Sequence, residues 1–147
     1  MPSIKCILCP VDFSETSNYA LAYATEMAHQ FQANIKLLHV IQLPAHPMDT
    51  NDLMPLEEFE TEYAARFQEQ LEKLVQRESD KGVEVEGLQA TGIPYDEIIN
   101  AADELNADMI VMGTHGRTGL AHFLIGSVAE RVVRMSPQPV LTVRAPT

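Results

Sequence analysis

Apolar and polar positions follow two periods along the chain, and together they predict five strands separated by four helices. Apolar and β-branched runs predict strands at residues 4–11, 34–40, 83–90, 108–112 and 139–144. Apolar residues at three- and four-residue spacing predict helices at residues 14–31 and 55–81, and two more that begin near residues 94 and 127. Residues 41–55 contain three prolines and are predicted to form a loop.

Residues at the ends of these helices supply start and stop signals. Ser14 is a candidate N-cap of the first helix. Acidic residues fill the outer face of the second helix, and Gly82 ends it. Pro94 lies in the first turn of the third helix, where proline is tolerated. Ser127 and Glu130 have the spacing of a capping box at the start of the fourth helix.

Strands and helices that alternate in this way form parallel strands joined by right-handed crossovers. The sequence therefore predicts an α/β fold: a doubly wound, Rossmann-like, five-stranded parallel sheet with helices on both faces, in one domain over residues 1–147. Two strand orders are open at this point, and they place the ligand crevice differently. The order 3-2-1-4-5 puts the crevice between the first and fourth strands, and the order 2-1-3-4-5 puts it between the first and third strands. The segment after the fourth strand is richer in anion-binding groups than Thr91–Pro94, which follows the third, and this favours 3-2-1-4-5.

The chain carries a formal net charge of −11, from 21 acidic and 10 basic residues. This charge disfavours binding to nucleic acid or to anionic lipid. Residues 49–108 hold 17 of the acidic residues and 4 of the basic ones, so the two ends of the chain are the better place for an anion. No apolar run is long enough to span a bilayer, and the stretch from Met1 to Asp12 is too short for a signal peptide. We therefore expect a cytoplasmic protein without direct membrane insertion.

Cys6 and Cys9 form a C-x-x-C pair, a spacing found in redox centres and in one half of a zinc site. Here the pair lies within an apolar strand, where residues three apart point to opposite faces. No second cysteine pair completes a metal site. We expect two buried thiols and no metal ligands.

The segment from residue 113 to residue 127 joins the fourth strand to the fourth helix and holds four of the seven glycines. Glycine backbones and a helix N-terminus suit a phosphate, and no acidic residue lies between Asp108 and Glu130, so the segment is a candidate phosphate cradle. The alternative is a glycine-rich turn with a geometric role only. The segment lacks both the lysine of a P-loop and the dinucleotide fingerprint. His115 and His122 could contact a phosphate or act as a general base, although a loop histidine is more often only solvated.

Asp12 directly follows the first strand. A carboxylate at the carboxyl end of a strand suits hydrogen bonds to ribose hydroxyls. The alternative is a helix cap or an exposed loop acid. In the order 3-2-1-4-5 the first and fourth strands are neighbours, so Asp12 and Gly113 would face each other across one crevice.

These residues resemble the universal stress protein family, in its ATP-binding subclass, over nearly the whole chain. The most specific match is the pattern G-x2-G-x9-G-[ST], formed by Gly113, Gly116, Gly126 and Ser127. Two shorter matches lie at strand ends: Pro10–Ser14 follows the first strand and Leu38–Val40 closes the second. Two more lie at element starts: Gly92–Pro94 precedes the third helix and Pro139–Leu141 opens the fifth strand. The resemblance implies ATP as the ligand, with Mg²⁺ accompanying its phosphates, and a homodimer paired through the fifth strand.

The resemblance also assigns the residues around the base and the sugar. Asp12 would hold the ribose hydroxyls, and Val40 would pair with adenine through its backbone. Val11 and Met112 would pack near the base and the sugar. Gly113 would contact the ribose and the α-phosphate.

The remaining residues that the resemblance assigns belong to the phosphates. Gly116, Gly126, Ser127 and Val128 would present N–H or hydroxyl groups to them. Arg117 would add a basic side chain. The Ser127 hydroxyl could cap the fourth helix or reach a phosphate, and its N–H could serve the phosphate while the side chain caps.

The leading functional interpretation is a nucleotide-sensing regulatory protein of the stress response. It would signal through a dimer or a higher assembly to a partner such as a transporter or an enzyme. The alternative is a slow ATPase or phosphoryl-transfer enzyme that uses the same site, although the sequence offers no clear water-orienting acid beside the phosphates. A third possibility is a structural dimer without nucleotide. We expect no catalytic residue and at most weak ATP hydrolysis.

Overall fold

The computed structural model of this chain describes residues 2–42, 56–115 and 125–146. Within them the elements alternate as the pattern predicts: β1 (Cys6–Pro10), α1 (Glu15–Phe31), β2 (Asn34–Ile41), α2 (Leu56–Ser79), β3 (Val85–Thr91), α3 (Pro94–Glu104), β4 (Met109–Gly113), α4 (Ser127–Met135) and β5 (Val140–Val143). The predicted loop at 41–55 is wrong at its first residue, because Ile41 still belongs to β2. The rest of that loop from residue 43 lies outside the described residues. None of the helices in the described ranges is long and apolar enough to cross a membrane.

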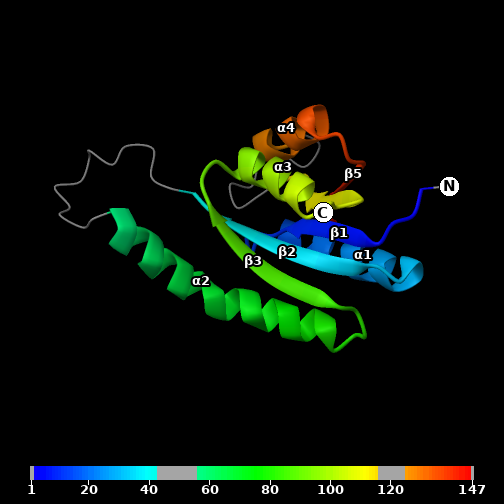
Figure 1. The fold of residues 1–147 in the computed structure, drawn as a ribbon, viewed down its shortest axis with the longest axis horizontal. Coiled ribbons are helices and arrows are strands. Elements are labelled where there is room, and N and C mark those ends of the chain that lie inside the picture. The colour runs from blue at the N-terminus through cyan, green and yellow to red at the C-terminus, as the bar shows by residue number, and fades with distance from the viewer. Residues whose placement is uncertain (1, 43–55, 116–124, 147) are drawn as a thin grey trace.

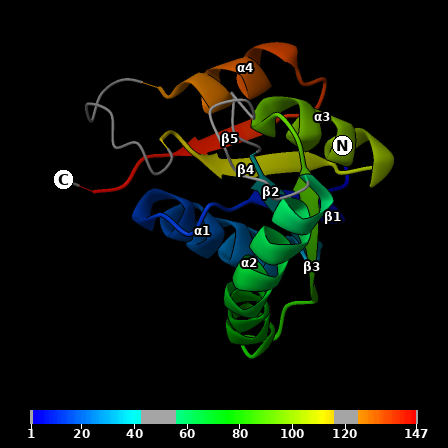
Figure 2. The same cartoon turned by 90° about the vertical axis from the view of Figure 1, so that its left-hand side faces the viewer.

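The five strands form one parallel sheet in the order β3-β2-β1-β4-β5. This confirms the predicted fold class and strand order. Helices α1 and α2 cover one face of the sheet, and α3 and α4 cover the other (Figures 1 and 2). The chain winds outward from β1 in one direction and from β4 in the other, so the reversal of strand order lies between these two central strands.

Strand β1 contributes to both cores of the molecule. Ile7 and Cys9 pack with α1 and α2, whereas Cys6 and Leu8 pack with α3 and α4. The two thiols are free, buried and on opposite faces of the sheet, as predicted. Burial raises the pKa of both thiols, most strongly that of Cys9, so neither is a reactive thiolate at neutral pH.

The predicted starts of α1 and α4 are correct, but the predicted side-chain cap forms only at α1. Ser14 caps α1, since its Oγ accepts a hydrogen bond from the Ser17 N–H at 3.1 Å. The predicted capping box at Ser127 does not form. Gly126 is the N-cap residue of α4 and Ser127 is already the first helical residue, so no side chain caps this helix.

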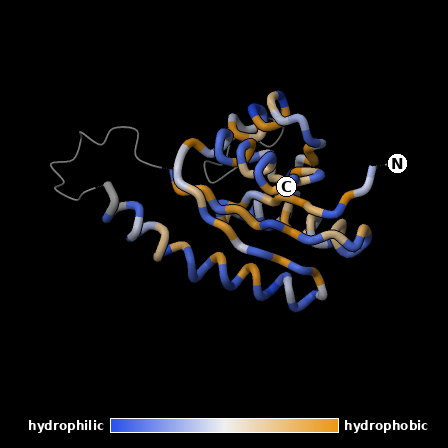
Figure 3. The backbone as a smooth tube through the Cα atoms, in the orientation of Figure 1, coloured by the Kyte–Doolittle hydropathy of each residue, from blue (hydrophilic) through white to orange (hydrophobic). Residues whose placement is uncertain are grey.

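Helix α2 packs one side against the sheet, and Figure 3 shows hydrophobic segments recurring along an otherwise hydrophilic helix. Leu71 and Leu74 are buried on the packed side. The helix ends at Ser79, before Gly82, whose φ of +92° is a turn conformation that suits glycine. The prediction that acidic residues fill the outer face is wrong at Glu78, which is buried.

Glu78 has a fully buried side chain, with 0 % exposure. Its carboxylate accepts three hydrogen bonds: from Thr25 Oγ1 of α1 at 2.8 Å, from Arg77 Nε at 2.6 Å and from Lys81 Nζ at 2.9 Å. Burial alone would raise the pKa of Glu78, but the hydrogen bonds outweigh burial and hold this pKa below its usual 4.5. The charged carboxylate therefore joins α1 to the end of α2.

Candidate functional site

A cavity of about 650 Å³ opens at the carboxyl ends of β1, β2 and β4. The first residues of α3 and α4 and two aromatic residues of α2 complete its wall. Eight of the residues that the sequence assigns to a nucleotide line this cavity: Val11, Asp12, Val40, Met112, Gly113, Gly126, Ser127 and Val128. Gly116 and Arg117 lie outside the described residues.

Asp12 lies where β1 turns into α1, and local hydrogen bonds fix its position. Its Oδ1 accepts from the Ser14 N–H at 3.0 Å, and its own N–H donates to Ser17 Oγ at 3.3 Å. Phe13 has a φ of +66°, a left-handed conformation that is rare for an aromatic residue and that turns the chain into the helix. Oδ2 makes no hydrogen bond to the described residues and can accept one from a ligand. The turn-forming role and the ligand-binding role are therefore compatible.

Two glycines allow the walls of the cavity to approach each other. A Cβ on Gly113 would lie 2.7 Å from Thr16 Cγ2 and 3.2 Å from Thr16 O, because β4 ends against the first turn of α1. A Cβ on Gly126 would lie 3.0 Å from Thr114 O, which accepts a hydrogen bond from the Gly126 N–H at 2.6 Å. Close packing within the protein is thus sufficient to explain both glycines.

Helix α4 begins at the cavity, with Ser127 and Val128 in its first turn. The Glu130 N–H donates to Gly126 O at 2.9 Å and is part of the regular helical ladder. The earlier N–H groups of Ser127 and Val128 have no partner inside the helix, and the helix dipole adds a partial positive charge there. The Gly126 N–H, which the sequence assigns to a phosphate, instead donates to Thr114 O. Of the described backbone N–H groups that the sequence assigns to a phosphate, this leaves those of Ser127 and Val128 available to an anion.

An aromatic cluster that the sequence does not assign to the site closes the α2 side of the cavity. Phe13, His39 and Phe67 have ring centroids 4.7–5.6 Å apart, and Tyr63 lies 6.1 Å from Phe67. His39 is 5 % exposed, and its Nδ1 lies 3.0 Å from Gln89 Oε1. The spacing of Tyr63 and Phe67 predicts only a common helix face. Their place beside the strand ends follows from the fold.

His115 lines the cavity just beyond the end of β4. Its Nδ1 lies 3.0 Å from Thr114 Oγ1, and its Nε2 is buried without a hydrogen-bond partner among the described residues. His115 is half-buried, so the expectation of a solvated loop histidine is wrong for it. A buried polar atom without a partner is uncommon, and Nε2 is therefore a candidate ligand contact. His122 lies outside the described residues.

Few charged residues line the cavity. In the described part of the chain, Asp12 is its only carboxylate and Arg131 of α4 is its only lysine or arginine. The same ranges contain no group of three or more side chains that could hold a metal ion. The cavity suits a ligand with an apolar portion, hydroxyl groups that reach Asp12 and an anionic end at α4.

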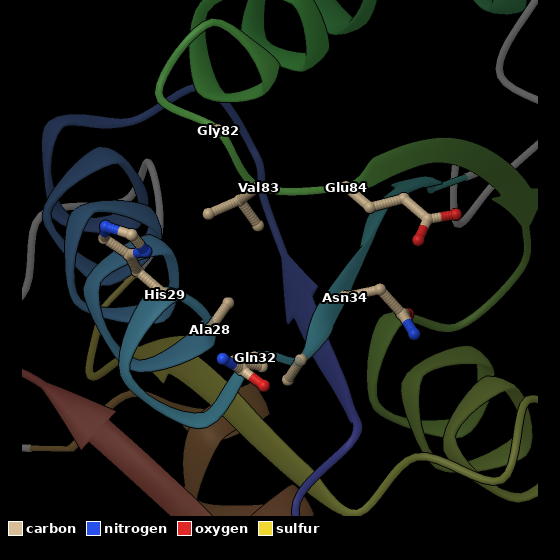
Figure 4. Close-up of a pocket in the computed structure, with 8 residues that line it drawn as sticks. Ala28, His29, Gln32, Asn34, Gly82, Val83 and Glu84 are labelled. Atoms are coloured by element: carbon tan, nitrogen blue, oxygen red, sulfur yellow. The ribbon is translucent and has the colours of Figure 1, made fainter.

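A second hollow of about 290 Å³ lies at the opposite end of the sheet, between the end of α1 and the turn that leads into β3. Figure 4 shows the Asn34 and Glu84 side chains on one side of it and His29 on the other. No residue that the sequence assigns to a ligand lines this hollow. The cavity at the carboxyl ends of the strands is therefore the candidate functional site.

Comparison with known proteins agrees with this fold. The family model described as the universal stress protein family matches residues 3–144. The chain belongs to the universal stress protein family. The universal stress protein MJ0577 of Methanocaldococcus jannaschii is 34% identical to it over an alignment of 155 positions. The alignment covers 95% of this chain and 94% of that protein. The solved structure of MJ0577 superposes on this chain with a TM-score of 0.81. The superposition covers 99% of this chain and 99% of the MJ0577 chain.

Two further solved universal stress proteins share the fold. UspA from Lactobacillus plantarum is 25% identical, with a TM-score of 0.81 over 98% of this chain and 100% of that one. A universal stress protein from Archaeoglobus fulgidus, solved in complex with dAMP, is 24% identical, with a TM-score of 0.68 over 98% of this chain and 100% of that one. Universal stress proteins of this fold therefore include one that binds an adenine nucleotide.

Proposed function

We propose that this chain binds an adenine nucleotide, ATP above all, in the cavity at the carboxyl ends of β1, β2 and β4. The observation that supports this most is the juxtaposition of Asp12 and Ser127, which line the same cavity from opposite sides of the reversal in strand order. Membership of a family that includes a dAMP complex adds to it.

The chemistry of the lining matches the three parts of a nucleoside triphosphate. Asp12 Oδ2 would accept hydrogen bonds from the ribose hydroxyls. The Ser127 and Val128 N–H groups would donate to phosphate oxygens at the positive end of α4. The Val40 backbone would pair with adenine, and Val11 and Met112 would pack against the base and the sugar. Gly113 would lie at the ribose and α-phosphate, and Gly126 would shape the phosphate end through its bond to Thr114 O.

Gly116 and Arg117 belong to the same proposal as phosphate contacts, on the strength of the sequence pattern alone. Mg²⁺ would accompany the phosphates when ATP binds. The described residues do not fit a protein-held metal, since no cluster of three or more ligating side chains occurs among them. We therefore assign Mg²⁺ to the phosphate oxygens and water.

The direct test identifies the ligand that co-purifies with the protein and measures the change in Tm when ATP is added. We expect mass spectrometry of the gently purified protein to detect an adenine nucleotide. Because a ligand stabilises the state that binds it, ATP at about 100 times its Kd should raise the Tm by about 5–10 °C. Absence of both the nucleotide and the shift would reject the proposal and favour a structural dimer without nucleotide.

Hydrolysis or phosphoryl transfer is the alternative function of the same site. Catalysis would need a positioned nucleophile and stabilisation of charge beyond the contacts that bind the phosphates. His115 is the candidate general base, because its Nε2 has no partner among the described residues. Sustained release of phosphate at more than about one per chain per second would favour an enzyme over a regulator.

We also propose that the protein acts in the cytoplasm as a regulator of the stress response. ATP binding would change a homodimer or a higher assembly and thereby its contact with a partner such as a transporter or an enzyme. A ligand can do this only if it binds one assembly state more tightly than the other. Light scattering with and without ATP would detect the change in assembly.

The proposed dimer pairs through β5, which lies at one edge of the sheet. The backbone oxygens of Pro139 and Val143 accept hydrogen bonds from the N–H groups of Ile110 and Thr114, on the β4 side. Because successive residues of a strand direct their backbone groups to opposite sides, the N–H and C=O of Thr142 point away from β4 toward the free edge. Thr142→Pro removes the outward N–H at a position where an edge strand tolerates proline. We expect this variant to be monomeric by light scattering and Thr142→Val, which keeps the N–H, to remain dimeric. A dimeric Thr142→Pro variant would place the interface elsewhere.

A further inference from the structure

Arg131 is the only lysine or arginine that lines the cavity in the described ranges. It lies in α4, four residues after Ser127, and residues with this spacing lie on the same face of a helix. The rise of a helix places it about 6 Å further along the axis than Ser127. Arg131 and the first residues of α4 therefore line the same cavity.

The charge of Arg131 is not neutralised by any described carboxylate. The next basic residue of α4 differs in this respect, because Arg134 Nε pairs with Glu130 Oε1 at 3.5 Å. No ion pair joins Arg131 to an acidic residue in the described ranges, in a chain that has more than twice as many acidic residues as basic ones. An unpaired cation on a cavity wall favours an anionic ligand group.

Tyr95 holds Arg131 in place. The guanidinium carbon lies 4.7 Å from the centroid of the Tyr95 ring, within the range of a cation–π interaction. Tyr95 belongs to the first turn of α3 and packs against the core formed with α4. Figure 2 shows α3 and α4 side by side on this face of the sheet. Stacking leaves the N–H donors at the guanidinium edge available for oxygen atoms of a ligand.

We propose that Arg131, held over Tyr95, binds the terminal phosphates of the nucleotide and thereby sets a preference for ATP over AMP. The inference rests on the proposed function, in which Asp12 holds the sugar and the α4 N-terminus holds the phosphates. With the sugar fixed at Asp12, a monophosphate ends near the glycines, whereas further phosphates extend along the α4 wall. A planar guanidinium is suited to a polyphosphate because it can donate two parallel hydrogen bonds.

The test compares the affinities of ATP, ADP and AMP by titration calorimetry at one ionic strength and one Mg²⁺ concentration. We expect Arg131→Gln to weaken ATP binding about tenfold and to change AMP binding less than about twofold, with ADP between them. Arg134→Gln is the matched control, because Arg134 lies on the same helix but does not line the cavity and is paired with Glu130. Its ATP-to-AMP affinity ratio should equal that of the wild type.

Two further variants separate a phosphate contact from a merely structural role. Arg131→Lys keeps the charge and should restore part of the ATP preference. Tyr95→Leu removes the ring below the guanidinium and should reduce the ratio of ATP affinity to AMP affinity about threefold. The effect of Arg131→Gln should also shrink at high salt, because ionic screening weakens contacts between charges.

Failure of this inference differs from failure of the proposed function. If the wild type binds none of the three nucleotides, the proposed function is wrong and this inference is wrong with it. If the wild type binds ATP but Arg131→Gln weakens ATP and AMP binding equally, or weakens neither, then Arg131 does not bind the terminal phosphates. In that case the nucleotide site stands without it.

Discussion

Replacing Asp12 with alanine is expected to weaken ATP binding by about tenfold or more, because a hydrogen bond to a charged group contributes about 1.5–3 kcal/mol. The loss should be much smaller for 2′,3′-dideoxy-ATP, which lacks the hydroxyl groups that Oδ2 would accept from. Titration calorimetry with the two ligands measures both losses. Equal losses for the two nucleotides would show that Asp12 does not hold the ribose.

Asp12→Asn is the matched control for this experiment. Asparagine keeps an oxygen that can accept from the Ser14 N–H, so the turn into α1 is preserved while the negative charge is removed. We expect an ATP affinity between those of the wild type and Asp12→Ala. The Tm of Asp12→Asn should equal that of the wild type, whereas Asp12→Ala should lose about 1 kcal/mol with the turn hydrogen bond.

The largest effect on stability is expected at Glu78. Glu78→Ala would leave the Thr25 hydroxyl buried without its acceptor and would open a cavity between α1 and α2, so we expect a loss of about 2–4 kcal/mol in the free energy of unfolding. Urea denaturation measures this loss. Glu69→Gln on the same helix is the control, because its pair with Lys73 is exposed and should contribute little. A Glu78→Ala variant as stable as the wild type would contradict a structural role for the buried carboxylate.

The contribution of Glu78 should also depend on pH. Its pKa is held below the usual 4.5 in the fold, so the unfolded chain takes up the proton first as the pH falls. The stabilisation is therefore complete above about pH 4.5 and is lost as the pH falls through the folded pKa. We expect the stability difference between the wild type and Glu78→Gln to shrink over that acidic range. A difference that stays constant with pH would mean that the charge of Glu78 does not stabilise the fold.

The strand order and the meeting of Asp12 with Gly113 in one cavity could be predicted from local patterns. Each strand and helix leaves its own periodicity in the sequence, and glycines gather after only one strand. The order of the sheet then brings the ends of β1 and β4 together without any knowledge of side-chain contacts. The capping box was wrong because Ser127 suits both the N-cap and the first helical position, and the sequence does not separate positions one residue apart.

The features that the sequence did not reveal all depend on contacts between distant residues. Glu78 continues the apolar stripe of α2, but its burial depends on Thr25, 53 residues earlier in the chain. Tyr95 and Arg131 are unremarkable on separate helices and become a pair only when α3 and α4 pack together. Helical periodicity identifies the face of a helix that is covered, but it does not identify the covering residues.

Cys6 and Cys9 are buried on opposite faces of the sheet, so each thiol can report when the helix layer that covers it separates from the sheet. Alkylation of Cys9 requires separation of α1 and α2 from the sheet, and alkylation of Cys6 requires the same of α3 and α4. Because native thiols react only when such an opening exposes them, the two labelling rates measure how often each layer detaches. Rates that coincide would identify a single cooperative unit, and rates that differ would identify the layer that opens first.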